Sequence, residues 1–245
     1  MKVALISDQH ANDVAFQATL EDIERIGVDS IVCLGDVAQG GAQPAETLDR
    51  LKALGCQTVL GNSDAFLLEL PTDSPELMTE QQLEVREWTV ARLDESHLAF
   101  MRTFEPALGL ELDGVRMLCF HGSPRSYDDL LLPEHEEASL ASFLGFDVDL
   151  LAGGHAHRQW ARVIGGALYV NPGSVGLAYD HHQAEQNFRV SPFAEYALAF
   201  LGGQGPGIEF RRVPFSVEAV RAAADASGRP DAATWAAQWS APGSA

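Results

Sequence analysis

The stretch KVALISDQH, residues 2–10, guides the interpretation of the whole chain. It begins as an apolar run and ends in the polar side chains of Asp8 and His10. A short apolar run of this kind is typical of a strand that is buried on both faces of a parallel sheet. In extended backbone, residues two apart point to the same side, so Asp8 and His10 are candidates for one shared site. The stretch therefore predicts a strand with metal-ligating side chains at its carboxyl end.

The first sixty residues continue this pattern, with strands and helices in alternation. Helical spacing occupies residues 13–27 and 43–55, and strand-like runs occupy residues 30–36 and 57–62. This alternation predicts a largely parallel sheet whose strands are joined by crossover helices. Functional groups on such a sheet belong at the carboxyl ends of its strands.

The middle of the chain, residues 64–106, has a different composition. It is rich in Glu, Leu, Gln and Arg, which favour helices, and we expect helices over residues 79–93 and 96–104. We interpret this segment as an insert that determines substrate specificity.

The second half of the chain is richer in strands. A hairpin is expected at Gly114 and a helix over residues 134–144. The expected strands of this half lie within residues 108–113, 115–122, 146–157, 166–174, 195–201 and 207–213.

We expect one domain over residues 1–215. Residues 216–245 follow as a C-terminal helix and a tail of small residues, which Trp235 and Trp239 can dock through their i,i+4 spacing.

The charge of the chain restricts its partners. With 35 acidic and 16 basic residues the formal net charge is -19, so a long nucleic acid or an anionic membrane is repelled, whereas small or metal-bridged anions are not. No run of about 18 apolar residues is present, and Asp8 interrupts the first apolar stretch too early for a signal peptide. We expect a cytoplasmic protein. The oligomeric state is not indicated.

The three cysteines, Cys33, Cys56 and Cys119, are interpreted as core thiols. Their number is odd, they lack the CxxC spacing of metal sites, and two of them lie within apolar runs.

Five strand-like runs end in residues that can bind metal, and together they form one candidate site. Seven groups are too many for one tetrahedral ion but suit two adjacent divalent ions, with the carboxylate of Asp36 as the natural bridge. Imidazole, carboxylate and amide donors favour Mn, Fe or Zn over calcium, and the absence of thiolates argues against a structural zinc. The candidate ligands are Asp8, His10, Asp36, Asn62, His121, His155 and His157.

The blocks SDQH, GDVAQGG, GNSD, FHGSP, GGHAH and NPGS resemble, in order and spacing, those of the calcineurin-like metallophosphoesterases. The likeness covers residues 1–201 and is strongest to the small bacterial and archaeal phosphodiesterases, which include symmetrical diadenosine-tetraphosphate hydrolases. It implies an α/β (α+β) fold, a four-layer αββα sandwich of two mixed β-sheets flanked by helices. It also implies two divalent metal ions, manganese foremost, and hydrolysis of a small phosphorylated substrate by attack of metal-bound hydroxide on phosphorus.

The resemblance also implies how the ligands divide between the two metals. Asp8, His10, Asp36 and His157 hold one ion, and Asp36, Asn62, His121 and His155 hold the other. Asp36, Asn62, His121 and His157 are the expected catalytic residues.

Substrate contacts are expected from Asn12 and Arg125, since a guanidinium can bind two phosphate oxygens, although Arg125 could equally form a surface salt bridge. Many relatives have a histidine after the metal-binding asparagine, where this chain has Ser63. A serine is a poor proton donor, so nucleotide or aryl leaving groups are favoured over alkyl monoesters.

Other interpretations remain open at this point. Asp64 is expected to cap the helix that follows it, and His181 and His182 are expected in solvent, with substrate contact as the alternative. A phosphomonoesterase or phosphoprotein phosphatase is an alternative function. So is a non-catalytic scaffold, as in a retromer subunit with this fold, but here all seven ligand positions are filled. A nuclease is disfavoured by the acidic composition.

Overall fold

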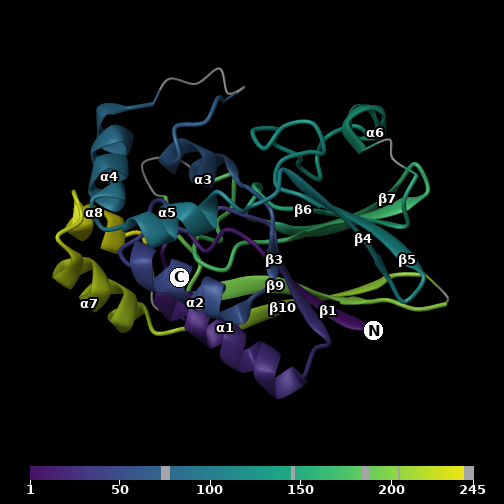
Figure 1. The fold of residues 1–245 in the computed structure, drawn as a ribbon, viewed down its shortest axis with the longest axis horizontal. Coiled ribbons are helices and arrows are strands. Elements are labelled where there is room, and N and C mark those ends of the chain that lie inside the picture. Colours follow the sequence, from purple (N-terminus) through teal and green to yellow (C-terminus); the bar gives the residue numbers. More distant parts are fainter. Residues whose placement is uncertain (73–77, 145–146, 184–187, 204, 240–245) are drawn as a thin grey trace.

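The computed structural model describes residues 1–72, 78–144, 147–183, 188–203 and 205–239. Two five-stranded sheets lie face to face, and helices cover the outer face of each (Figure 1). These layers confirm the four-layer αββα sandwich expected from the sequence.

The first sheet contains the opening stretch at its centre. Its order is β10-β9-β1-β2-β3, in which β1, β2 and β3 run parallel and β9 and β10 run antiparallel to their neighbours. The sheet is therefore mixed, with the predicted parallel arrangement confined to its first three strands. The strands are β1 (Lys2–Ile6), β2 (Ser30–Cys33), β3 (Gln57–Thr58), β9 (Phe193–Phe200) and β10 (Gly207–Pro214).

The second sheet begins with the predicted hairpin, whose turn has Gly114 at φ +77°. Its order is β4-β5-β6-β8-β7, with β5, β6 and β8 parallel and the two outer strands antiparallel. The strands are β4 (Ala107–Leu112), β5 (Val115–Phe120), β6 (Leu150–Gly153), β7 (Gln159–Ile164) and β8 (Ala167–Pro172).

Strand β1 shows why both of its faces are apolar. Val3 and Leu5 pack into the core between the two sheets, and Ala4 and Ile6 pack into the core beneath the helices. All four are completely buried, because the period-two alternation of a strand sends successive side chains to opposite layers. A strand covered on both faces reads as a continuous apolar run.

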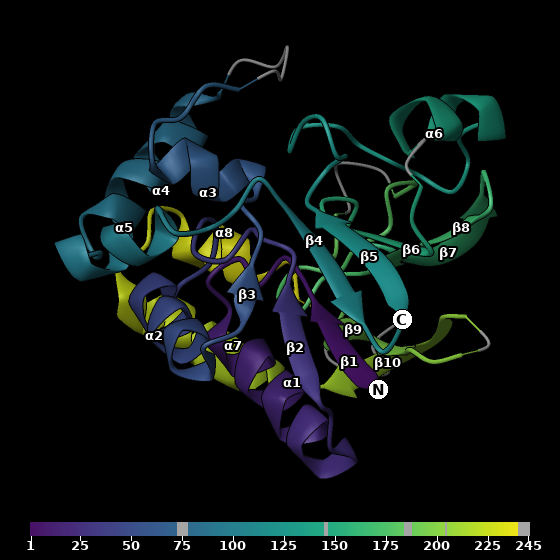
Figure 2. The same cartoon turned by 45° about the vertical axis from the view of Figure 1, so that its right-hand side comes forward.

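The helices divide between the two outer layers and one end of the molecule. Helices α1 (Asp13–Ile26), α2 (Pro44–Leu54), α7 (Val217–Ser227) and α8 (Ala232–Ala236) share the apolar core on the outside of the first sheet. Helix α6 (Glu137–Leu144) covers the second sheet. Helices α3 (Asn62–Leu67), α4 (Glu80–Val90) and α5 (Glu95–Met101) gather at one end, as Figure 2 shows.

The helices expected in the middle segment are confirmed, with shorter bounds than the sequence predicted. Helix α4 starts where Thr79 caps it by accepting from Gln82 N, and Asp94 caps α5 in the same way. The division into a domain and a specificity insert stays a prediction.

The C-terminal segment is held by its tryptophans. The rings of Trp235 and Trp239 lie 4.3 Å apart between centroids, and the two residues are 6% and 0% exposed. Residues 240–245 of the expected tail lie outside the described residues. Cys33 and Cys119 are buried and Cys56 is partly buried, and all three are free thiols. Within the described residues, no helix is long and apolar enough to cross a membrane.

Candidate metal centre

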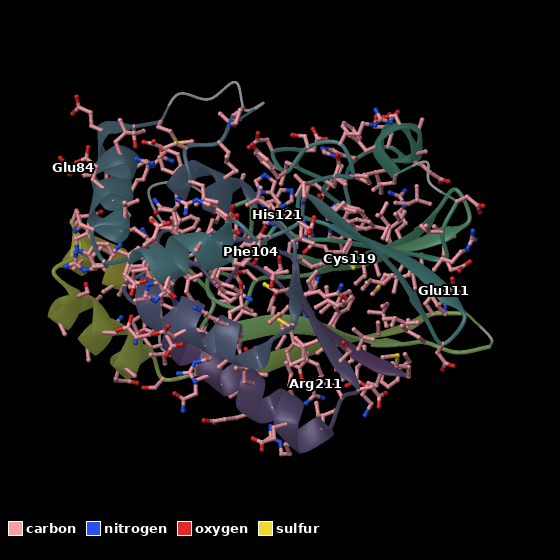
Figure 3. The ribbon with its side chains drawn as sticks, viewed as in Figure 1. Glu84, Phe104, Glu111, Cys119, His121 and Arg211 are labelled. Carbon is pink, nitrogen blue, oxygen red and sulfur yellow. The ribbon has the colours of Figure 1, made fainter. Side chains whose placement is uncertain are left out.

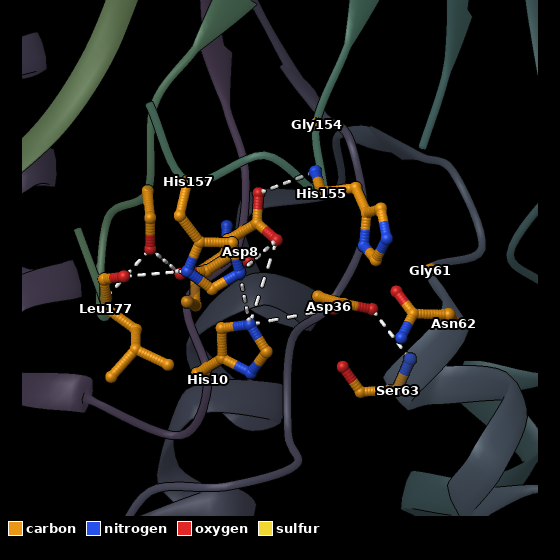
Figure 4. Close-up of polar contacts among 12 residues, drawn as sticks. Asp8, His10, Asp36, Gly61, Asn62, Ser63, Gly154, His155, His157 and Leu177 are labelled. Atoms are coloured by element: carbon orange, nitrogen blue, oxygen red, sulfur yellow. Dashed lines mark hydrogen bonds and ion pairs between the residues drawn. The ribbon is translucent and has the colours of Figure 1, made fainter. Parts of the chain in front are cut away.

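All seven predicted ligands meet at one edge of the two sheets. Each follows a strand or begins a helix, so the ends of β1, β2, β5 and β6 and the start of α3 bring them together. His121 marks this place near the middle of the molecule in Figure 3, and Figure 4 labels the other six ligands at close range.

The ligand atoms form two groups that share one carboxylate. Asp8, His10, Asp36 and His157 make the first group, and Asp36, His121 and His155 make the second, with the ligand atoms of each group within 4.8 Å of one another. In addition, Asn62 Oδ1 lies 3.0 Å from His121 Nε2. These two groups of side chains are those that the resemblance implied, with Asp36 in both, and their assignment to two metal ions stays a prediction.

The ligands converge through left-handed backbone rather than through the pleat of a strand. Five of the seven have positive φ, with values from 46° to 66°: His10, His157, Asp8, Asp36 and His155. The extended geometry predicted for the two i,i+2 pairs is therefore wrong, although both pairs do converge. Non-glycine residues adopt this conformation at a cost, and such strain gathers at functional sites.

The two carboxylates are almost completely withdrawn from water. Asp8 is 0% exposed and Asp36 is 2% exposed. Asp8 Oδ1 accepts no hydrogen bond in the described part of the chain, and the nearest cationic candidate is His157 Nε2 at 3.1 Å. Asp36 Oδ2 lies 3.3 Å from His121 Nε2, while its Oδ1 accepts from Ser63 N at 2.9 Å (Figure 4).

Asp64 holds the backbone of the turn that carries the shared carboxylate of Asp36. Its two oxygens accept from the backbone N–H groups of Asp36 at 2.8 Å, Val37 at 2.9 Å and Gly61 at 3.1 Å. The bond to Gly61 caps α3, but Asp64 lies within the first turn of this helix and not before it, where the sequence predicted it. The bonds to Asp36 and Val37 were not predicted, and they fix the turn that presents Asp36. Burial and the charge of Asp36 raise the pKa of Asp64 to about 6.

Backbone carbonyls orient three of the histidines. The Nδ1 atoms of His10, His121 and His157 lie 2.7 to 2.8 Å from the carbonyl oxygens of Gln39, Leu34 and Leu177. A carbonyl only accepts, so each Nδ1 carries a proton and each ring turns its Nε2 atom into the site. This arrangement is typical of histidines that bind metal.

The electrostatics of the site favour a bound cation. Burial disfavours a charged His121, but the carboxylates of Asp36 and Asp8 outweigh it and raise the pKa of His121 to about 10. Burial also opposes ionisation of Asp8 and Asp36, yet the neighbouring histidines hold the pKa of both carboxyls below the usual range. His155 differs, since burial and the charge of His121 lower its pKa to about 4. The carboxylates therefore stay charged and need positive charge beside them.

The residues present fit divalent metal ions. His10 Nε2 and His157 Nε2 face each other at 3.1 Å, and in the neutral rings both atoms carry lone pairs. Together with the orphaned Asp8 Oδ1, they present acceptors without donors, which a cation satisfies. The first group would hold one ion and the second group, with Asn62, would hold the other.

Glycines allow the ligands to approach so closely. A Cβ atom on Gly61 would lie 2.0 Å from Asp36 Oδ1, and one on Gly154 would lie 2.2 Å from Ser7 Oγ and 3.2 Å from Asp8 Oδ2. Any other residue at these two positions would displace a carboxylate or its surroundings.

A pocket of about 680 Å³ opens over this centre. His10, Asn62 and His155 contribute from the centre, and the helical segment contributes mainly apolar side chains. The polar groups of the lining include Gln39 and, from the helical segment, Gln81 and Gln82. Outside the centre, the lining also includes Ser63, Phe66, Tyr179, His181 and Arg229.

The two predicted substrate contacts lie away from the pocket lining. Asn12 caps α1 by accepting from Ala15 N, and its amide donates to Gly176 O at 3.0 Å. Arg125 is exposed and donates to the carbonyl of Ser142. Their contact with substrate stays a prediction without support from this geometry, because both side chains already have other partners.

Three pocket residues, Tyr179, His181 and Arg229, lie outside the predicted ligand set. His181 is half-buried and lines the pocket with its Nε2 2.6 Å from Ala156 O, so its contact with substrate stays a prediction, whereas His182 is exposed as expected. Tyr179 lies beside His157, with the two rings tilted by 54° and their centroids 5.1 Å apart. Arg229 was missed, because no local pattern connects it to the ligand blocks.

Comparison with known proteins agrees with this geometry. The model of the calcineurin-like phosphoesterase superfamily domain matches residues 1–190. An uncharacterized protein of Methanocaldococcus jannaschii is 27% identical over 184 residues, which are 73% of this chain and 71% of that protein. A metallophosphoesterase from Sphaerobacter thermophilus is 24% identical with a TM-score of 0.73, and the match covers 97% of this chain and 98% of that one. A hypothetical protein from Pyrococcus horikoshii reaches a TM-score of 0.80 at 16% identity, with 94% of each chain covered. The chain therefore belongs to the calcineurin-like phosphoesterase superfamily.

Proposed function

We propose that this chain is a dinuclear, metal-dependent phosphoesterase that hydrolyses a small phosphodiester or nucleotide. The observation that carries the proposal is the pair of ligand groups that share Asp36 at the base of the pocket. Two divalent ions held there supply Lewis-acid stabilisation of phosphoryl charge and lower the pKa of a water molecule. Manganese is the first ion to test, with iron and zinc as alternatives that the same donors accept.

The side chains of the centre have separate tasks in this proposal. The carboxylates of Asp8 and Asp36 supply the negative charge, and His121 and His157 present Nε2 acceptors in fixed directions because their Nδ1 atoms are anchored. Asn62 adds a neutral amide oxygen beside His121. The left-handed backbone and the carbonyl anchors hold these groups in place before substrate arrives, which avoids reorganisation during the reaction.

Ser63 determines which leaving groups the site can use. It lines the pocket directly after Asn62, where a stronger acid would protonate the departing oxygen. With a hydroxyl there, the proposal favours esters whose leaving group is stable as an anion, such as aryl esters and nucleotides. Membership in the small phosphodiesterase branch stays a prediction.

The pocket supports a small substrate. Its volume of about 680 Å³ is in the range of sites for nucleotide-sized ligands, and Phe66 and Tyr179 offer aromatic surface to an apolar moiety. A scaffold that only binds protein needs no complete ligand set around a pocket, so we favour the enzyme.

The test is hydrolysis by metal-stripped protein with and without Mn²⁺. The substrates are bis-p-nitrophenyl phosphate, p-nitrophenyl phosphate and a dinucleoside polyphosphate, and His155→Ala is compared with the exposed control His182→Ala. We expect manganese-dependent turnover, preference for diesters over the monoester, and loss of turnover in His155→Ala alone. No turnover on any substrate by protein that carries two metals would contradict the proposal.

A further inference from the structure

The C-terminal segment contributes a basic residue to the pocket. The family match ends at residue 190, yet Arg229, which lies between α7 and α8, lines the pocket together with residues of the metal centre. It is 8% exposed although it is an arginine. Such burial of a guanidinium is uncommon unless the group is paired or binds something.

The contacts of Arg229 place its guanidinium beside the loop that supports the centre. Nε donates to Gly40 O at 3.1 Å, and Gly40 follows Gln39, whose carbonyl anchors the ring of His10. The guanidinium also lies 5.0 Å from the ring centroid of Trp235, which is buried in the core. The docking of α8 therefore fixes Arg229 at the pocket wall.

Part of the hydrogen-bonding capacity of Arg229 is unused. Nη1 donates to Pro230 O at 2.9 Å and to Asp231 Oδ1 at 3.0 Å. Nη2 has no hydrogen-bond partner among the residues that the structure describes. A guanidinium offers five N–H donors in a fixed plane, so donors remain for a ligand.

The surroundings make an anion the natural ligand. Within the described lining, Arg229 is the one Lys or Arg side chain. Asp231 neutralises it in part, but Asp231 also accepts from Gln81 of α4, so its charge is shared. A guanidinium withdrawn from water gains more from an incoming phosphate than a solvated one does.

We propose that Arg229 binds a second anionic group of the substrate, apart from the phosphoryl group held at the metal centre. Its hydrogen bonds among the described residues go to Gly40, Pro230 and Asp231 and to none of the seven ligands, so we place the group that it binds apart from the metal-bound one. The substrate class is then an organic phosphodiester that carries a further phosphate. This inference rests on the proposed function and deepens it.

The test uses two substrates that differ only in the second phosphate. These are thymidine 5′-(p-nitrophenyl phosphate) and the same compound with a 3′-phosphate, which share the reacting ester and the leaving group. Arg229→Gln is compared with Arg92→Ala, because Arg92 donates to Ser227 O at 2.7 Å and supports the same turn from outside the pocket lining. All assays use full-length, manganese-loaded protein at fixed ionic strength.

We expect the wild type to prefer the 3′-phosphorylated substrate in kcat/KM by about tenfold or more, and Arg229→Gln to lose that preference while Arg92→Ala retains it. Equal losses on both substrates in Arg229→Gln would show a structural role or a contact with the phosphoryl group that both substrates share, and an unchanged preference would exclude the contact with the second phosphate. Either result overturns the inference.

A binding measurement separates this inference from the proposed function. Calorimetry compares thymidine 3′,5′-bisphosphate with thymidine 5′-monophosphate on the same proteins. If the wild type hydrolyses neither ester but binds the bisphosphate about tenfold more tightly than Arg229→Gln does, the proposed function fails and the anion site stands. If the bisphosphate binds both proteins equally, the anion site is refuted.

Discussion

The rings of His10 and His157 point their Nε2 atoms at each other across 3.1 Å, while the Nδ1 atom of each is anchored to a backbone carbonyl. In the neutral rings the facing atoms are both acceptors, and Asp8 Oδ1 beside them is buried without a donor. The fold thus assembles acceptors that a proton on one of the rings or a metal ion can bridge. Left-handed backbone at His10 and His157 maintains this arrangement.

The close approach of Gly61 to the shared carboxylate gives a sharp prediction. Gly61→Ala places a methyl group 2.0 Å from Asp36 Oδ1, so Asp36 must move and we expect a loss in kcat of about 100-fold or more. Gly109→Ala is the matched control, because its added Cβ meets nothing within 4 Å. Hydrolysis of bis-p-nitrophenyl phosphate and metal content measure the effect. Wild-type activity in Gly61→Ala would mean that Asp36 is not held at this place.

The role of Asp64 is tested by a nearly isosteric change. In Asp64→Asn an NH₂ group replaces one oxygen and faces a backbone N–H of Asp36 or Val37, so the turn that presents Asp36 loses an acceptor. We expect metal affinity to fall about 10- to 100-fold. Competition with a chelator measures it, with the exposed Asp49→Asn as the control. An unchanged metal affinity would show that Asp64 caps α3 but does not position Asp36.

The residue after Asn62 should set the dependence on the leaving group. With Ser63 in place, we expect kcat to fall steeply along a series of aryl phosphodiesters as the pKa of the leaving phenol rises. Ser63→His supplies a proton donor at a residue that lines the pocket, so the slope should become shallower. The slope of log kcat against leaving-group pKa is the measurement. Identical slopes in both proteins would show that this position does not act on the leaving group.

A buried ion pair away from the centre gives a prediction for stability. Asp22 is 2% exposed and accepts from Tyr196 Oη at 2.7 Å and from Arg211 Nη2 at 3.1 Å. Burial opposes its ionisation, but these bonds and one from Arg25 hold the pKa of Asp22 below its usual value. The stabilisation is therefore complete above the unfolded pKa of about 4 and is lost as the pH falls through the lower folded pKa.

Tyr196→Phe removes one of these bonds to a charged group and should lower the free energy of unfolding by about 2 kcal/mol at neutral pH. Urea titrations at pH 7 and pH 3 measure the difference, which should shrink at the lower pH. A difference that is the same at both values would show that ionised Asp22 is not its source.

Much of the centre could be predicted from sequence because of one rule. Polar residues that end parallel strands meet at one edge of a sheet, and this rule places Asp8 beside Asp36 in the first sheet and His121 beside His155 in the second. The packing of the two sheets then brings these edges together. A second rule, the two-residue period of extended backbone, predicted that His155 and His157 converge. They do converge, but for another cause, since their backbone is left-handed rather than extended. Short-range patterns do not determine the path of a turn.

The wall of the pocket could not be predicted in this way. Arg229 reaches it only because Trp235 packs into the outer core and fixes the turn before α8, which is a tertiary contact without a local signal. Asp64 has a recognisable capping position, but its bonds to the backbone of Asp36 and Val37 depend on how two separate loops meet. Contacts between distant segments are decided by packing rather than by propensity.

The most direct test of the central claim is the variant Asp36→Asn, measured for metal content and for manganese-dependent hydrolysis of bis-p-nitrophenyl phosphate. Asp36 is the one ligand shared by both groups, so its loss affects both ions at once. We predict a folded protein, shown by a cooperative thermal transition, that binds fewer than the two metals of the wild type and has no measurable turnover. Near-normal turnover of Asp36→Asn with manganese present would contradict the assignment of the centre.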